Sequence, residues 1–288
     1  MQRLTPYLRL MRMDKPIGIW LLFFPAAWGM LLAPAPLRWD LLAALLLGAV
    51  ITRAAGCILN DLADRKLDAQ VARTRTRPLA SGEVTVRDAW VLLAVLGVNG
   101  LVLAAALPRQ VLLLALLAIP LIAAYPFMKR ITFWPQAFLG LTFNLGALMG
   151  WAATGAALSA PAFLLYAACV CWTLGYDTLY AVQDMADDAN AGIKSSARRV
   201  GTGRRLQGFV LACYATMLLL LWTAFSLTDP PNGAWLVGLK LAALLLGWQV
   251  WRAGALQPGD MQAGRLFRSN QWVGLLVLLG LLWPALFP

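Results

Sequence analysis

Residues 41–59 read LLAALLLGAVITRAAGCIL, a run of nineteen residues in which Arg53 is the one charged side chain. A helix of about 20 mostly apolar residues is long enough to cross the hydrocarbon core of a bilayer. The length of this run and its near-absence of charge therefore predict a transmembrane helix rather than a helix at the surface of a soluble domain.

Eight further apolar runs occur along the chain, with no polar domain between them. Together the nine runs cover residues 17–33, 41–59, 89–107, 111–128, 134–153, 162–182, 208–227, 234–251 and 271–287. Hydrophobic residues make up 61% of the chain, charged residues make up 13%, and the mean hydropathy is +0.70. The sequence predicts an all-α, polytopic membrane protein, with residues 1–288 forming one domain of about nine transmembrane helices in one bundle.

The net charge of +11 comes from 24 Lys and Arg against 13 Asp and Glu. Twenty of the 24 basic residues fall on one side of the predicted bundle, and Arg38 and Arg109 fall on the other. This bias predicts a cytoplasmic N-terminus and a C-terminus on the opposite side of the membrane. The expected location is a cell inner membrane or a mitochondrial inner membrane. The excess charge is typical of contact with anionic lipid and does not indicate a nucleic-acid partner.

The chain contains no histidine, which excludes histidine metal ligands and Ser-His or Cys-His catalysis. Its four cysteines, Cys57, Cys169, Cys171 and Cys213, all lie inside apolar runs and are interpreted as packing residues. Acid–base or metal chemistry therefore depends on carboxylates.

Seven of the thirteen acidic residues gather in two short segments: Asp61, Asp64 and Asp68, and Asp177, Asp184, Asp187 and Asp188. In the first segment, Asn60, Asp64 and Asp68 are spaced four residues apart and predict one stripe of a continuing helix. In the second segment, Asp177, Tyr180, Asp184 and Asp188 share one face of a helix in the same way. Both segments follow helices that are predicted to end on the cytoplasmic side.

Carboxylates stacked on one helix face beside hydrocarbon need cations to compensate their charge. Mg²⁺ fits this setting, because it is usually held by one or two carboxylates while substrate phosphates complete its coordination. The two segments therefore predict a cavity for a Mg²⁺-bound diphosphate at the cytoplasmic mouth. The alternative is that these acids form ordinary ion pairs with neighbours such as Arg65 and Lys66.

Basic residues follow each acidic segment, and Arg77 and Lys194 are the two predicted to bind diphosphate oxygens. Arg53 differs from them because it lies inside an apolar run, seven residues before Asn60 and on the same helix face. An arginine within a membrane span indicates a functional site.

These motifs resemble those of the UbiA superfamily of intramembrane prenyltransferases, and within it the enzymes that prenylate 4-hydroxybenzoate for ubiquinone biosynthesis. The resemblance covers residues from about 13 to 201. It rests on Asn60-Asp61-x-x-Asp64-x-x-x-Asp68, on Asp177-x-x-Tyr180 through Asp187-Asp188 with Gly192-Ile-Lys194, on Asp14-Lys-Pro-Ile-Gly18, on Arg53-Ala-Ala-Gly-Cys57, and on Tyr125-Pro-Phe-Met-Lys-Arg130.

The resemblance implies Mg²⁺-dependent transfer of a polyprenyl group from polyprenyl diphosphate to the ring carbon ortho to the hydroxyl of 4-hydroxybenzoate. The expected metal ligands are Asp64, Asp68, Asp184 and Asp188. Asn60, Arg77 and Lys194 are expected to bind the diphosphate, and Arg53 and Arg130 the aromatic acid. Asp61 or Asp187 is expected to take a proton, and Tyr180 is a third catalytic candidate.

Two other interpretations remain open at this point. A related prenyltransferase would use a different acceptor, such as haem, a chlorophyllide, homogentisate or a naphthoate. A transporter would place its charged residues near the middle of the membrane with access from both sides. The position of the acidic segments at one side of the predicted bundle favours a prenyltransferase.

Overall fold

The computed structural model describes residues 4–70, 74–228 and 233–286, and the ordered elements in these ranges are helices. They are α1 (Thr5–Leu10), α2 (Ile17–Leu32), α3 (Trp39–Asp68), α4 (Val86–Ala105), α5 (Arg109–Ile131), α6 (Pro135–Phe143), α7 (Leu145–Ala153), α8 (Ala160–Ala181), α9 (Met185–Asn190), α10 (Ser196–Val200), α11 (Arg204–Thr228), α12 (Ala234–Ala253) and α13 (Gln262–Leu286). The predicted all-α class is confirmed.

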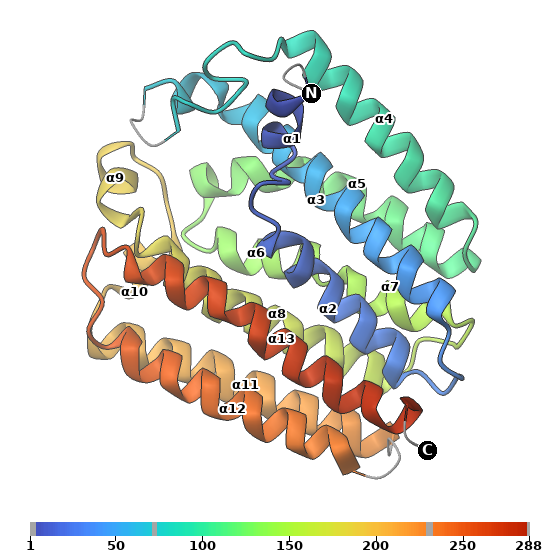
Figure 1. Cartoon of the computed structure of the whole chain (residues 1–288). Coiled ribbons are helices and arrows are strands. Elements are labelled where there is room, and N and C mark those ends of the chain that lie inside the picture. The colour runs from blue at the N-terminus through green and yellow to red at the C-terminus, as the bar shows by residue number, and fades with distance from the viewer. Residues whose placement is uncertain (1–3, 71–73, 229–232, 287–288) are drawn as a thin grey trace.

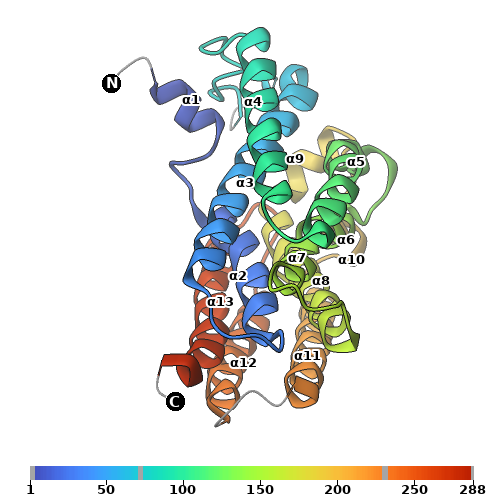
Figure 2. The same ribbon diagram turned by 90° about the vertical axis from the view of Figure 1, so that its right-hand side faces the viewer.

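Seven helices within the described ranges are long and apolar enough to cross a membrane: α3, α4, α5, α8, α11, α12 and α13. They run roughly alongside one another in a single bundle (Figures 1 and 2). Each coincides with one of the apolar runs of the sequence. The chain is therefore a multi-pass membrane protein.

The two remaining apolar runs form shorter elements. Helix α2 has 16 residues, and the run at 134–153 is divided into α6 and α7 at Asn144. The buried Asn144 amide donates hydrogen bonds to the Gly140 carbonyl at 2.8 Å, the Cys169 carbonyl at 3.1 Å and the Thr173 hydroxyl at 2.8 Å. A helix break inside a membrane bundle is tolerated where protein groups satisfy the polar atoms. The count of nine spans stays a prediction.

Helices α2 and α7 pack at very short range. A Cβ atom added at Gly150 would overlap with the Ala26 carbonyl, and one added at Gly29 would overlap with the Ala147 carbonyl. Small residues allow this approach of two backbones, which is a common packing mode of membrane helices. The contact fixes the broken segment against the first long helix after α1.

The last helices join the same core. Helix α13 packs against α2 and α8, and the Trp172 indole of α8 donates a hydrogen bond to the side chain of Asn270 at 2.8 Å. Gln249 of α12, fully buried, accepts one from the Tyr214 hydroxyl at 2.7 Å. Buried polar pairs of this kind fix the register of helices that otherwise share only apolar contacts.

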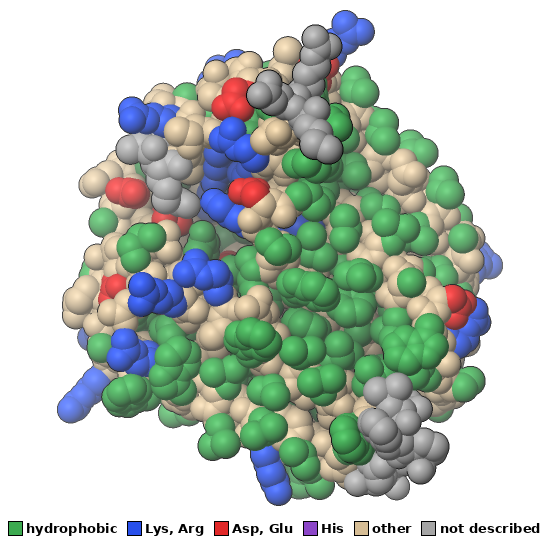
Figure 3. Space-filling model, viewed as in Figure 1, with side chains coloured by type: hydrophobic (Ala, Val, Ile, Leu, Met, Phe, Trp, Pro, Cys, Tyr) green, Lys and Arg blue, Asp and Glu red, His purple; other side chains and the backbone are tan. Residues whose placement is uncertain are grey.

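Charged side chains are unevenly distributed over the surface. In Figure 3 the Lys and Arg side chains gather around a hollow in the left and upper part of the view, where Figure 1 shows α9, α10 and the segment after α3. The middle of the molecule is mainly hydrophobic. Helix α1 and the end of α13 lie at opposite ends of the bundle (Figures 1 and 2).

Candidate active site

The two acidic segments meet at one cavity of about 290 Å³ at the end of the bundle. Its wall includes six of the seven clustered aspartates that the sequence singled out, together with three basic side chains. The charged lining residues are Asp64, Asp68, Asp177, Asp184, Asp187, Asp188, Arg77, Lys129 and Lys194. The uncharged polar residues of its wall are Asn60, Thr74, Tyr125, Gln136, Tyr180 and Ser195. Chain segments more than a hundred residues apart therefore form one site.

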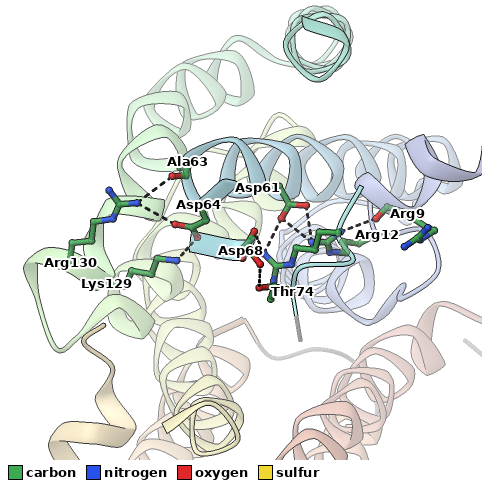
Figure 4. Close-up of polar contacts among 10 residues, drawn as sticks. Arg9, Arg12, Asp61, Ala63, Asp64, Asp68, Thr74, Lys129 and Arg130 are labelled. Carbon is green, nitrogen blue, oxygen red and sulfur yellow. Dashed lines mark hydrogen bonds and ion pairs between the residues drawn. The ribbon is translucent and has the colours of Figure 1, made fainter. Parts of the chain in front are cut away.

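Helix α3 continues without interruption to Asp68, so the predicted stripe of Asn60, Asp64 and Asp68 exists. Asp64 is 2% exposed. Its carboxylate forms an ion pair with Lys129 and a second one with Arg130 at 3.4 Å (Figure 4). A buried carboxylate needs such compensation, and both cations come from the end of α5.

The second segment is not one continuous helix, so the predicted 3.6-residue stripe from Asp177 to Asp188 is wrong in its geometry. Helix α8 ends at Ala181, and α9 begins at Met185. The Val182 carbonyl accepts a hydrogen bond from the Gly259 backbone at 3.0 Å, in the loop between α12 and α13. The same carbonyl also accepts the Met185 N–H at 3.4 Å, so a turn rather than a continuing α-helix joins α8 to α9. The turn still brings Asp184 and Asp188 to the cavity wall.

The loop after α9 is joined to α5 and α6 by several hydrogen bonds. The Lys194 backbone N–H donates to the Lys129 carbonyl at 2.8 Å, and the Lys194 ammonium donates to the Ile131 carbonyl at 3.0 Å. The buried Gln136 side chain accepts from the Ser196 N–H at 3.0 Å. These bonds hold the second acidic segment opposite α3.

Asp61 lies on a different face of α3 from Asp64 and outside the cavity lining. It is 1% exposed, accepts hydrogen bonds from the Arg12 guanidinium at 2.9 Å on both oxygens, and accepts one from Arg77 at 3.2 Å (Figure 4). Arg77 also binds Asp68 at 2.8 Å. Burial disfavours the charged form of Arg77, but the carboxylates of Asp61 and Asp68 outweigh it and raise the pKa of Arg77.

Asp61→Asn is expected to lower the free energy of unfolding by about 3 kcal/mol, because it leaves two largely buried guanidinium groups without their shared countercharge. The loss should appear as a lower temperature of thermal aggregation of the purified protein in detergent. Asp40→Asn is the control: its pair with Arg38 is exposed at both side chains, so little change is expected. Equal stability of the two variants would contradict the role given to Asp61.

Arg53 lies further inside the bundle, and its guanidinium packs directly against Gly18 of α2. Its Nε atom is buried and has no hydrogen-bond partner among the described residues. Arg53 and Asp177 are close enough to interact electrostatically. A buried donor without a partner is costly, and such a donor beside a polar cavity indicates a ligand that supplies the missing acceptor.

Arg130 is placed differently from Arg53. Its side chain is 46% exposed, lies 5.7 Å from the centre of the Phe127 ring and donates to the Ala63 carbonyl at 3.3 Å. It lines a neighbouring hollow rather than the acidic cavity. The predicted joint action of Arg53 and Arg130 on one acceptor therefore remains a prediction, and the geometry places Arg130 with Asp64.

The carboxylate oxygens of the acidic cavity fit a magnesium ion that is shared with a diphosphate. Among the described residues, no three acidic or cysteine side chains are close enough to hold a metal ion by themselves. Mg²⁺ does not need such a cage, since one or two carboxylates and phosphate oxygens are sufficient. Asp64 and Asp68 on one wall, with Asp184 and Asp188 on the other, have the required chemistry.

Three residues of this region were not assigned roles from the sequence. Lys129 was counted with the charges that set topology, although it pairs with Asp64. Arg12, which pairs with Asp61, and Gln136, which accepts from the Ser196 N–H, also had no assigned role. The signal available for Lys129 was its position next to Arg130 at the end of a predicted span. The partnerships of Arg12 and Gln136 depend on long-range packing and left no local pattern.

Residues 22–284 match the UbiA prenyltransferase family. The chain is 42% identical to a mitochondrial 4-hydroxybenzoate polyprenyltransferase of Aedes aegypti, over 98% of the chain and 64% of that relative. It is also 42% identical to a 4-hydroxybenzoate octaprenyltransferase of Coxiella burnetii, over 98% of the chain and 96% of that relative. The chain thus spans slightly less than two thirds of the insect relative and nearly the whole length of the bacterial one.

The fold is also that of a solved structure. A UbiA homolog from Archaeoglobus fulgidus, bound to DMAPP and Mg²⁺, superimposes with a TM-score of 0.72 over 98% of this chain and 99% of that one, at 19% identity. At this identity the likeness concerns the fold. Together with the match along residues 22–284, it leads to one conclusion: the chain belongs to the UbiA prenyltransferase family.

Proposed function

We propose that the protein transfers a polyprenyl group from polyprenyl diphosphate to the ring carbon ortho to the hydroxyl of 4-hydroxybenzoate, a step of ubiquinone biosynthesis. The observation that carries the proposal is the cavity where Asp64 and Asp68 of α3 face Asp184 and Asp188, with basic side chains on the same wall. The names of relatives about 40% identical to the chain support 4-hydroxybenzoate as the acceptor.

Asp64, Asp68, Asp184 and Asp188 would hold Mg²⁺ in this cavity. The ion would supply positive charge against the diphosphate as its bond to the allylic carbon breaks. The A. fulgidus homolog, whose structure contains Mg²⁺ and a prenyl diphosphate, supports this role for a divalent ion.

The basic residues of the wall would bind the phosphate oxygens that the ion leaves free. Lys129, Arg77 and Lys194 line the same cavity, and Asn60 adds a neutral donor. Lys129 and Arg77 pair with Asp64 and Asp68, so their charges already lie where a diphosphate would bind. Fixed cations at a developing negative charge stabilise the transition state because they need no reorganisation.

Arg53 would bind the carboxylate of the acceptor. The guanidinium offers parallel donors to a carboxylate, and its Nε has no partner among the described residues. This arrangement would orient the ring so that its ortho carbon faces the allylic cation in a site that excludes water.

Proton removal restores the aromatic ring. Asp187 lines the cavity, whereas Asp61 is held by two arginines away from it. We therefore favour Asp187 as the proton acceptor and give Asp61 a positioning role toward Arg77. Tyr180, also on the cavity wall, would contact the substrate.

The same proposal covers the placement of the chain. Residues 1–288 would act as a single domain in a cell inner membrane or mitochondrial inner membrane, with the cavity and the N-terminus on the cytoplasmic (or matrix) side and the C-terminus opposite. A reporter that works only outside the cytoplasm (or matrix) should be active when it is fused to the C-terminus. Activity of a C-terminal reporter that works only in the compartment of the N-terminus would contradict this topology.

A panel of acceptors tests the substrate assignment. Purified protein with radiolabelled geranylgeranyl diphosphate and Mg²⁺ should label 4-hydroxybenzoate in preference to homogentisate, 1,4-dihydroxy-2-naphthoate, chlorophyllide or haem. Faster transfer to another acceptor in the panel would keep the reaction class and reject 4-hydroxybenzoate as the substrate.

Gly18→Ala is expected to raise the apparent KM for 4-hydroxybenzoate about fivefold to tenfold, because the new methyl group would displace the Arg53 guanidinium. The apparent KM for the prenyl diphosphate should change little. Gly97→Ala, where an added Cβ meets no atom within 4 Å, is the matched control. An unchanged KM for 4-hydroxybenzoate in Gly18→Ala would contradict the placement of the acceptor at Arg53.

A further inference from the structure

A second hollow, of about 790 Å³, opens on the side of the bundle beside the acidic cavity. It lies between α3, the start of α4, the end of α5 and residues 191–193. Its floor is apolar, with Leu59, Leu62, Trp90, Phe127 and Ile193 among its lining residues. The proposed reaction gives this hollow no role.

Three basic side chains border the apolar floor: Arg65, Lys66 and Arg130. Arg65 and Lys66 are exposed, and neither forms an ion pair within the described parts of the chain. They also line an adjoining, more polar hollow formed with Ser81, Gly82 and Thr85. Two cations without countercharge therefore stand at the boundary between an apolar surface and a polar one.

The hollow has the features of a membrane–water interface. Trp90 is 53% exposed and Phe127 is 45% exposed, and large aromatic rings are enriched at this depth of a bilayer. The hollow lies at the ends of α3 and α5, the same end of the bundle as the acidic cavity and its basic residues. Basic pockets between membrane helices on the cytoplasmic side bind the head groups of anionic lipids.

We propose that this hollow binds an anionic phospholipid. The phosphate contacts Arg65, Lys66 and the exposed part of Arg130, and one acyl chain lies along Leu62, Trp90 and Phe127. The ligand matches both halves of the surface, because its phosphate supplies the missing countercharge and its acyl chain covers the apolar floor. The proposal is independent of the reaction assigned to the neighbouring cavity.

Native mass spectrometry of the detergent-purified protein tests the proposal. Phosphatidylglycerol should be retained in preference to phosphatidylcholine with the same acyl chains. The double variant Arg65→Gln/Lys66→Gln should weaken phosphatidylglycerol binding about 10- to 30-fold, the effect expected for two interfacial charges. Arg204→Gln/Arg205→Gln, an adjacent exposed pair at the start of α11, is the matched control and should bind as the wild type does.

Three results would overturn the proposal. Equal retention of the two phospholipids would exclude selection by charge, and equal loss in both double variants would reduce the effect to net charge. Displacement of phosphatidylglycerol by farnesyl diphosphate at equimolar concentration would assign the hollow to the prenyl donor instead. A phosphatidylglycerol with a photoreactive diazirine on its acyl chain locates the site directly, with crosslinks expected at Trp90 or Phe127.

Discussion

Replacing Asp64, Asp68, Asp184 or Asp188 by asparagine is expected to lower kcat about 100- to 1000-fold, the range found when a single preorganised group that stabilises transition-state charge is removed. Each substitution keeps the shape of the side chain and removes one negative charge from the cavity wall. The loss should be partly reversed at high Mg²⁺ concentration, because a weakened metal site is filled again by mass action. Initial rates measured across a Mg²⁺ titration provide the test.

Asp40→Asn is the matched control for these variants. Asp40 lies on the same helix α3, but at the opposite end, where it pairs with Arg38 on the surface. Its removal should leave both the rate and the Mg²⁺ dependence unchanged. A cavity variant with wild-type turnover at limiting Mg²⁺ would remove that aspartate from the metal site.

The first half of the site could be predicted from local sequence because it lies on one continuous helix. Helix α3 runs from an apolar span directly into the acidic stripe, so the spacing of Asn60, Asp64 and Asp68 fixes their common face. The nine apolar runs likewise predicted the position of each long helix. In these cases the relevant interactions are between residues a few positions apart.

The second half depended on interactions that local spacing does not reveal. The end of α8 at Ala181 involves a hydrogen bond from Gly259 to the Val182 carbonyl, nearly eighty residues apart in the chain. The break at Asn144 depends on Cys169 and Thr173 of the neighbouring helix α8. An apolar run indicates that a span exists, but its interruptions are set by polar partners on other helices.

Asp61 and Arg130 show that the contacts of a single side chain also cannot be read from local sequence. Both belong to the quoted motifs, and the resemblance implied a catalytic role for Asp61 and an acceptor-binding role for Arg130. In the folded chain Asp61 faces Arg12 and Arg77, and Arg130 faces Asp64 and the side of the bundle. Proximity along the sequence does not determine which side of a helix faces a cavity.

Arg53→Lys is expected to raise the apparent KM for 4-hydroxybenzoate about 10-fold or more, because a hydrogen bond to a charged group contributes about 1.5 to 3 kcal/mol. Lysine retains the positive charge but loses the parallel donors that fix a carboxylate. The buried Nε of Arg53, which has no partner among the described residues, is the donor whose loss matters most. The apparent KM for the prenyl diphosphate should stay within about twofold of the wild type, since Arg53 does not line the diphosphate cavity.

Arg252→Lys is the control for this substitution, because Arg252 lies at the end of α12 against Trp251. It should leave both KM values unchanged. If Arg53→Lys raised the KM for the diphosphate and left that for 4-hydroxybenzoate unchanged, Arg53 would belong to the donor site.

The most direct measurement combines the purified wild-type protein, geranylgeranyl diphosphate and 4-hydroxybenzoate, with mass spectrometry and NMR of the product. With Mg²⁺ present, the expected product is a 4-hydroxybenzoate that carries the prenyl group ortho to its hydroxyl, with release of diphosphate. No product is expected after EDTA treatment. Product formation at the same rate in EDTA, or hydrolysis of the diphosphate without any prenylated aromatic acid, would contradict it.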